Sequence, residues 1–187
     1  MSGFNEAKAW IDLRLTQKQP MILALEGGAA CGKTTLAAQL AHHYGALVIH
    51  MDEFFLPPAM RSEARFAEPG GNIHYERFNA QVAQPLRRGE AFSYEIFDCS
   101  AGKISGEKRI EKNALIIVEG VYSLHPLYRD IYTHSIFLKT DEKTQDKRLQ
   151  ARGEWLYQKF QSLWLPLERA YFQQFNIEKS CDLVLET

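Results

Sequence analysis

One stretch of the chain carries the residue types that bind phosphate groups. Residues 27–34 read GGAACGKT and match the pattern G-x-x-x-x-G-K-[ST] at every defined position. An apolar run at residues 21–25 precedes this stretch, and a helical pattern over residues 35–44 follows it. A strand, a glycine-rich loop and a helix in that order form a phosphate-binding loop, whose backbone N–H groups point at the phosphates. The alternative is a chance match, because glycine, lysine and threonine are common residues.

The motif predicts a role for each of its residues. We expect Lys33 to reach the β- and γ-phosphates of a nucleoside triphosphate and the Thr34 hydroxyl to hold Mg²⁺. The residues expected to bind ATP are Gly27, Gly28, Ala29, Ala30, Cys31, Gly32, Lys33, Thr34 and Thr35.

Acidic residues follow two other apolar runs. Asp52 and Glu53 come after residues 46–49, and Glu119 comes directly after residues 114–118. Ligands of parallel sheets bind beyond the carboxyl ends of the strands, so we expect these carboxylates to lie near the phosphates. Glu119 is the candidate for the Mg²⁺ site, and Asp52 is the candidate base for an acceptor hydroxyl, with Glu53 as second choice. A loop cap at Asp52 and a polar strand end at Glu119 are the structural alternatives.

A basic helix face is predicted in the last third of the chain. Arg148 and Arg152 are four residues apart and therefore share one side of a helix. Such a face could neutralise charge that develops on a transferred phosphoryl group. An ordinary solvated basic face is the alternative.

The elements that position these residues alternate between strand and helix. Expected strands are residues 21–25, 46–49, 114–118, 136–138 and 183–185, and expected helices are residues 4–16, 35–44, 75–89 and 142–175, the last with breaks at Gly153 and Pro166. Residues 92–110 predict an edge hairpin. Residues 54–75 look irregular, and their place after Asp52 favours a substrate lid. The alternation predicts an α/β fold with a parallel sheet covered on both faces.

The composition favours one ordinary globular domain spanning residues 1–187. The chain has 187 residues, 45% of them hydrophobic, and a net charge of −1, which argues against nucleic acid or an anionic membrane as partner. No apolar run is long enough to span a membrane, and the first residues lack the apolar core of a signal peptide. Three separated cysteines form neither a metal motif nor a disulfide framework. We expect a cytoplasmic protein; the aromatic residues between 155 and 175 predict core or a dimer face, so a homodimer stays open.

Together, these segments resemble the uridine kinase-like branch of P-loop kinases. The resemblance is carried by the phosphate loop, HMDEFF at 50–55, EPGGNIHYERF at 68–78, PLRRGEAFSYEIFD at 85–98, IIVEGVYSLHP at 116–126 and the basic helix. It implies a three-layer P-loop NTPase-type fold with five parallel strands in the order 2-3-1-4-5, a small edge hairpin, an acceptor region over about residues 54–110 and a helical lid over about residues 142–165. It also implies that Asp52 is the catalytic base, that Glu119 belongs to the Mg²⁺ site, and that Arg148 and Arg152 are lid arginines.

The chain departs from uridine-cytidine kinases after the first arm of the hairpin. Those enzymes place a pyrimidine-reading histidine after a Tyr-Asp-Phe segment, where this chain has Ala101 or Gly102. A site that lacks its polar partner discriminates poorly, so the resemblance carries kinase chemistry but not uridine. Besides Asp52 and Glu53, the candidates for the acceptor site are His74, Arg77, Tyr94 and Asp98, each of which could equally be a structural residue.

The expected function is therefore ATP- and Mg²⁺-dependent transfer of the γ-phosphate to a hydroxyl of a small molecule. A nucleoside or another ribose-bearing metabolite is the preferred acceptor. The alternatives are a kinase for a vitamin or sugar acid, such as pantothenate or glycerate, and a nucleotide-binding regulatory protein that uses ATP as a switch.

Overall fold

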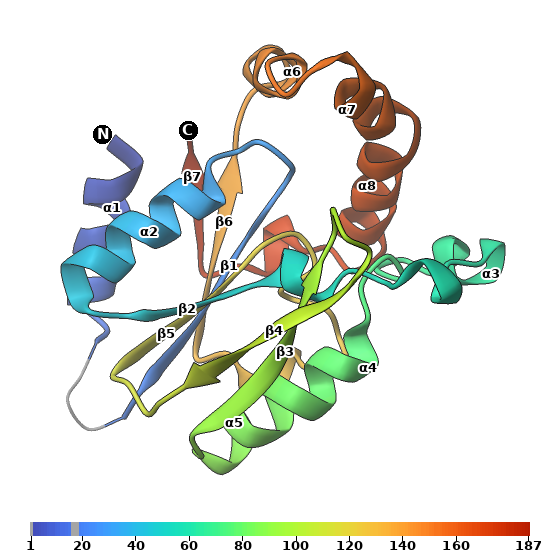
Figure 1. Cartoon of the computed structure of the whole chain (residues 1–187). Helices are drawn as coiled ribbons and strands as arrows, with labels where there is room; N and C mark the ends of the chain where they lie inside the picture. Colours follow the sequence, from blue (N-terminus) through green and yellow to red (C-terminus); the bar gives the residue numbers. More distant parts are fainter. Residues whose placement is uncertain (1, 16–18) are drawn as a thin grey trace.

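A five-stranded parallel sheet forms the centre of the computed structural model, which describes residues 2–15 and 19–187 (Figure 1). In spatial order the strands are β2 (Leu47–His50), β5 (Leu115–Glu119), β1 (Met21–Gly27), β6 (His134–Lys139) and β7 (Leu183–Glu186). Counted along the chain among these parallel strands, the order is 2-3-1-4-5, as the resemblance implied. The strand order reverses at β1, so the carboxyl ends of β1 and its neighbours border the crevice where such sheets bind ligands.

Apolar residues alternate between the two faces of this sheet. All five residues of β5 are buried, with Leu115 and Ile117 in one core cluster and Ile116 and Val118 in the other. This two-residue period places successive side chains on opposite faces. A strand buried on both faces reads as a continuous apolar run, which is why this pattern predicted a strand so clearly.

Two helices cover the first face. The first is α1 (Ser2–Asp12), and the second is α2 (Lys33–Tyr44), which follows the phosphate loop. Ala7 and Ile11 of α1 are fully buried in the same cluster as Leu36 and Leu40 of α2. The N-terminal helix is therefore a packing helix. It ends earlier than the predicted residues 4–16, and residue 16 lies outside the described residues.

A continuous helical run covers part of the second face. It consists of α4 (Tyr75–Phe78), the π-helical turn η3 (Asn79–Ala83) and α5 (Gln84–Arg88). Phe78, Val82 and Leu86 pack with Ile116 and Val118 of the sheet. The helix predicted over residues 75–89 is confirmed, with a π turn inside it.

The predicted edge hairpin is also present. Strands β3 (Phe92–Asp98) and β4 (Lys103–Ile110) pair in antiparallel fashion, with a register shift between Ile96 and Phe97. Lys108 of β4 donates its Nζ to the carbonyl oxygen of Val48 at 2.9 Å. This contact fastens the hairpin beside β2, the edge strand of the main sheet.

The last third of the chain forms a helical arch. Its parts are α6 (Glu142–Gln150), α7 (Glu154–Lys159), the π-helical turn η5 (Phe160–Trp164) and α8 (Leu165–Gln174). Figure 1 shows α6 beyond the carboxyl end of β6 and the α7–α8 run descending along one side of the molecule. The break at Gly153 is confirmed, but the break predicted at Pro166 is wrong. The wider π turn before Pro166 suits a residue that has no N–H to donate, and the helix continues through it.

Short helices organise the segment expected to be irregular. Two of them, η2 (Pro58–Met60) and α3 (Glu63–Ala67), lie within this segment, and η1 (Met51–Phe54) leads into it. Two further short helices, η4 (Arg129–Ile131) and η6 (Glu178–Ser180), lie in other connections. Within the described residues, no helix has the length and apolar character required to cross a membrane.

Candidate active site

The phosphate loop leaves β1 through backbone conformations that favour glycine. Gly27 has a φ of +142°, and a Cβ on this residue would lie 2.3 Å from the carbonyl oxygen of Leu138. Ala30 has a φ of +59°, a left-handed conformation that costs energy for a residue with a side chain. The loop therefore holds a curled shape that the surrounding structure must support.

Lys33 spans the loop from its far end. Its side chain is buried, and Nζ donates to the carbonyl oxygens of Gly27 at 2.9 Å and Gly28 at 2.8 Å. The Cys31 sulfur lies 3.7 Å from the same nitrogen. These contacts keep the ammonium group across the mouth of the loop, where a positive charge would meet phosphate oxygens.

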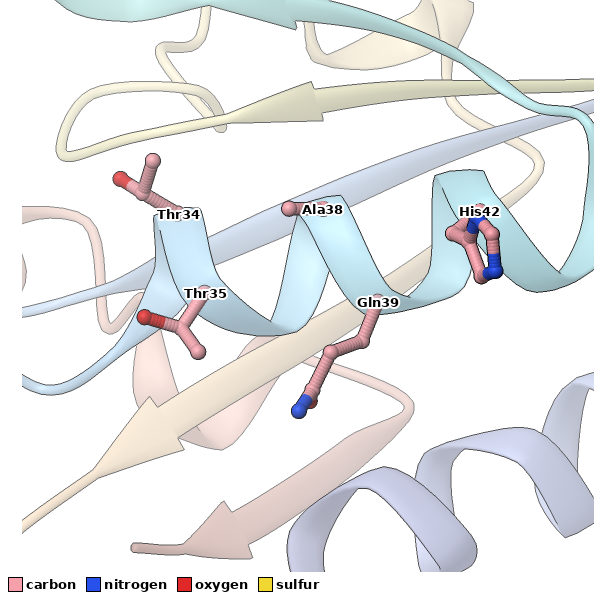
Figure 2. A pocket seen from close by; sticks show the side chains of 5 residues that line it. All are labelled: Thr34, Thr35, Ala38, Gln39 and His42. Carbon is pink, nitrogen blue, oxygen red and sulfur yellow. The ribbon is translucent and has the colours of Figure 1, made fainter.

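The two oxygen donors predicted for Mg²⁺ lie together. The Thr34 hydroxyl donates to Oε1 of Glu119 at 3.0 Å. Thr34 and Thr35 lie in the first turn of α2, and together with Ala38, Gln39 and His42 they line a hollow along this helix (Figure 2). Hydroxyl and carboxylate oxygens are ligands that suit Mg²⁺, so this pair fits the ion.

His50 is a site residue that the sequence analysis missed. Its Nδ1 lies 2.6 Å from Oε1 of Glu119, the same oxygen that accepts from Thr34. This hydrogen bond raises the pKa of His50 above its usual value. Parallel pairing puts His50 of β2 opposite Glu119 of β5. Its place at a strand end, two residues before Asp52, was the available signal.

Asp52 and Glu53 occupy different environments although they are neighbours in η1. The Asp52 side chain is exposed, and its pKa is raised, first by partial loss of hydration and next by the negative charge of Glu119. The Glu53 carboxylate accepts a hydrogen bond from the Tyr94 hydroxyl and lies 4.0 Å from the Lys108 ammonium. Glu53 is thus engaged with the hairpin, whereas Asp52 lies within reach of the charge of Glu119.

The other acceptor-site candidates lie near η1 but differ in whether their polar groups already have hydrogen-bond partners within the protein. Arg77 donates to the backbone carbonyls of Glu53, at 2.6 Å, and Glu95, and its guanidinium lies over the Phe54 ring. Asp98 accepts from the backbone N–H and hydroxyl of Ser100 and closes the hairpin turn.

His74, by contrast, retains hydrogen-bonding capacity. Its Nδ1 is buried without a hydrogen-bond partner, and burial lowers the pKa of the ring. Tyr94 is buried and its hydroxyl is already committed to Glu53. The group therefore contains one histidine with a free nitrogen and three residues that also support the backbone or the hairpin.

An arginine that the sequence did not single out holds the segment after η1. Arg65 of α3 donates to the backbone carbonyls of Gly71 and Ile73, each at 3.0 Å. It also donates to both carboxylate oxygens of Glu76, at 2.7 and 2.8 Å, and its guanidinium lies over the Tyr75 ring. The planar guanidinium therefore ties α3 to the start of α4.

The predicted lid arginines lie on the expected helix and its end. Arg148 of α6 donates to the carbonyl oxygen of Ala30 at 3.1 Å, so it contacts the phosphate loop. Arg152, after α6, lies over the Phe160 ring, with 5.3 Å between the guanidinium carbon and the ring centroid. The structure thus brings Arg148 to the loop directly and keeps Arg152 among the lid helices.

A buried glutamate joins three parts of the site. Glu26, the last residue before the loop, is fully buried. Its two oxygens accept from the N–H groups of Gly27, Tyr122 and Leu124 and from the hydroxyls of Ser123 and Tyr171. It was missed because an acidic residue in a strand gives no sign of its partners, which follow β5 and lie in α8.

The sheet, the phosphate loop and the helical arch define a P-loop kinase fold. No protein-family model matches the chain. It is 30% identical over 144 residues to uridine kinase-like protein 4 of Arabidopsis thaliana, a match that covers 73% of this chain and 30% of the plant protein. The chain therefore spans less than a third of the length of that relative.

Solved structures agree with this relationship. A putative fructose transport system kinase from Silicibacter sp. TM1040 is 25% identical, with a TM-score of 0.71 and 99% of each chain covered. A possible uridine kinase from Bacillus stearothermophilus has a TM-score of 0.75 at 18% identity, covering 98% of this chain and 97% of that one, and supports the fold. The chain belongs to the uridine kinase-like branch of the P-loop kinases.

Proposed function

We propose that the protein is a kinase that uses ATP and Mg²⁺ to phosphorylate a hydroxyl group of a small molecule. The preferred acceptor is a nucleoside or another ribose-bearing metabolite. The observation that carries the proposal is the convergence of Lys33, the Thr34–Glu119 pair and Asp52 at the carboxyl ends of β1, β5 and β2. A relative named as a uridine kinase-like protein supports this acceptor class. That relative is a longer protein, of which the match covers 30%.

Each residue has a role in phosphoryl transfer. Lys33 would bind oxygens of the β- and γ-phosphates, and Thr34 with Glu119 would hold Mg²⁺, which neutralises phosphate charge when bound. Asp52 would accept the proton of the acceptor hydroxyl while the hydroxyl oxygen forms a bond to the γ-phosphorus. The bond between the γ-phosphorus and the oxygen that leaves with ADP breaks in the same step. Arg148 and Arg152 would stabilise the negative charge of the transferring group.

The environments of the two neighbouring carboxylates support Asp52 rather than Glu53 as the base. A base must be able to reach a substrate hydroxyl, and the Asp52 side chain is exposed. Glu53 already accepts from Tyr94 and lies near Lys108. We infer that Glu53 shapes the acceptor side of the site.

A pair of isosteric substitutions tests this assignment. We expect Asp52→Asn to lower kcat by about 10²–10⁴-fold, the usual contribution of a general base, while MgATP binding stays within about twofold. Glu53→Gln should retain far more of the turnover. The measurement is acceptor-dependent ADP formation, with MgATP binding followed by calorimetry. Full turnover in Asp52→Asn, or a larger loss in Glu53→Gln, would contradict the base assignment.

A further inference from the structure

Side chains from two helices of the arch, α6 and α8, bind a single residue of the phosphate loop. The backbone N–H of Ala29 donates to Oε2 of Glu168 in α8 at 2.9 Å. The carbonyl oxygen of Ala29 accepts from Nε2 of Gln145 in α6 at 2.8 Å. Both backbone groups of this residue are therefore satisfied by side chains more than a hundred positions away in the sequence.

The packing around these contacts is close. Glu168 is only 6% exposed, and a Cβ added to Gly28 would lie 3.1 Å from Nε2 of Gln145. The absence of a side chain at Gly28 thus lets α6 approach the loop. The positive charge of Lys33 acts on the Glu168 carboxylate, although burial is the larger effect and raises its pKa.

The contacts leave the start of α2 available. The first N–H groups of a helix have no partners within the helix, and in a phosphate-binding loop these groups face the phosphates. Glu168 and Gln145 bind Ala29, which precedes that set. A nucleotide could therefore bind at the beginning of α2 while both side-chain contacts persist.

We propose that Gln145 and Glu168 are positioning residues that hold the phosphate loop in its anion-binding shape before the nucleotide arrives. The inference rests on the proposed function and adds to it a direct link between lid and loop. A loop with Ala30 in a left-handed conformation needs support from outside its own backbone. Without these two side chains, part of the energy of nucleotide binding must be used to order the loop, and affinity falls.

Four variants separate the hydrogen bonds from the charge. Glu168→Ala and Gln145→Ala each remove one contact with Ala29. Glu168→Gln keeps an oxygen that can accept from the Ala29 N–H and removes the charge. Gln158→Ala is the matched control, because Gln158 lies in α7 and its Nε2 donates to Glu154 within the same helix.

Two measurements apply to every variant whose thermal unfolding is cooperative. Calorimetric titration with MgATP gives Kd, and amide hydrogen exchange of peptides covering residues 27–35, without nucleotide, reports the order of the loop. We expect Glu168→Ala and Gln145→Ala to weaken MgATP binding by roughly tenfold, the equivalent of a lost hydrogen bond that leaves a buried group unpaired. Both should speed exchange in the loop and raise KM for ATP without changing KM for the acceptor. Glu168→Gln should stay within about threefold of the wild type, and Gln158→Ala should match it.

Other outcomes overturn the inference. Unchanged or tighter MgATP binding in a folded Glu168→Ala would mean that this carboxylate competes with the nucleotide rather than supporting its site. Should Glu168→Ala fail to fold, wild-type affinity and exchange in Gln145→Ala would overturn the proposal equally. Hydrogen exchange keeps the two hypotheses separate: a wild-type protein that binds no MgATP contradicts the proposed function, whereas unchanged loop exchange in the variants contradicts the positioning role.

Discussion

Glu26 is the residue on which the strand before the loop, the segment after β5 and the helix α8 converge. Burial raises its pKa to about 7, even though hydrogen bonds from Leu124, Gly27 and Tyr171 and the charge of Lys33 act in the opposite direction. A carboxyl group of an unfolded chain titrates near 4.5. Between these two values the folded protein holds this proton more tightly than the unfolded chain does, so folding is linked to proton uptake.

The sign of this linkage predicts how stability changes with pH. The contribution of Glu26 is most favourable below about pH 4.5, declines as the pH rises to about 7 and is constant above that, with a total change of at most about 3 kcal/mol. Urea unfolding of the wild type and Glu26→Gln at several pH values between about 5 and 7.5 measures it. The variant should lack the decline that the wild type shows. Glu186→Gln, which alters an exposed glutamate at the end of β7, is the control; parallel curves for the wild type and Glu26→Gln would contradict the assignment.

Motif spacing predicted some site residues because their chemistry depends on neighbours in sequence. Lys33 and Thr34 follow from the loop pattern, and Glu119 follows from its place at a strand end. His50 also ends a strand and could have been found by the same signal, but Glu26, Gln145 and Glu168 could not be predicted in this way. Their partners are brought together only by the strand order and the helix packing, and a single sequence does not specify such distances.

At the scale of elements, the segment between η1 and α4 is more ordered than its composition suggests. Its proline and glycine residues indicated loop, but Arg65 binds two backbone carbonyls and Glu76 at once. The Arg65 side chain is mostly buried, whereas most surface arginines stay hydrated. One guanidinium group therefore joins several parts of this segment, which we propose borders the acceptor.

Replacing that group tests the role of the segment. Arg65→Lys keeps the charge but loses the planar fork, so it cannot reproduce the bonds to Gly71, Ile73 and Glu76. We expect KM for the acceptor to rise by roughly tenfold, as two or more hydrogen bonds are weakened, with Kd for MgATP unchanged. Steady-state kinetics and limited proteolysis within residues 56–75 measure the effect. Arg88→Lys is the control, since Arg88 is exposed and pairs with Glu90; an unchanged acceptor KM in Arg65→Lys would show that the segment does not shape the acceptor site.

Each of the two π-helical turns is followed by a helix with a proline in its first turn. The turn η3 precedes Pro85, and η5 precedes Pro166. In both places a proline in the first turn of the next helix does not end the helical run. Sequence rules expect a helix to break near an internal proline, and this explains why the break predicted at Pro166 was wrong.

At the scale of the whole molecule, the sequence was sufficient for the architecture. Each of the five central strands is a short apolar run, and residues of β5 alternate between the two cores. The strand order came from the resemblance, because apolar runs do not specify which strands are neighbours. The contacts of Gln145 and Glu168 with the phosphate loop could not be predicted, since they depend on how α6 and α8 pack against the loop.

We propose that this site transfers the γ-phosphate of ATP to a hydroxyl group of a small compound. The most direct test is ATP consumption with Mg²⁺ against a panel of nucleosides, nicotinamide riboside, pantothenate and simple sugar acids, with the phosphorylated product identified by mass spectrometry. We expect at least one acceptor, most readily a ribose-bearing one, to raise turnover well above the background with water alone. We also expect Asp52→Asn to abolish this increase. The kinase function would be contradicted if no acceptor stimulated ATP consumption in protein that binds MgATP and changes its oligomeric state on binding. That result would favour a nucleotide-dependent regulator.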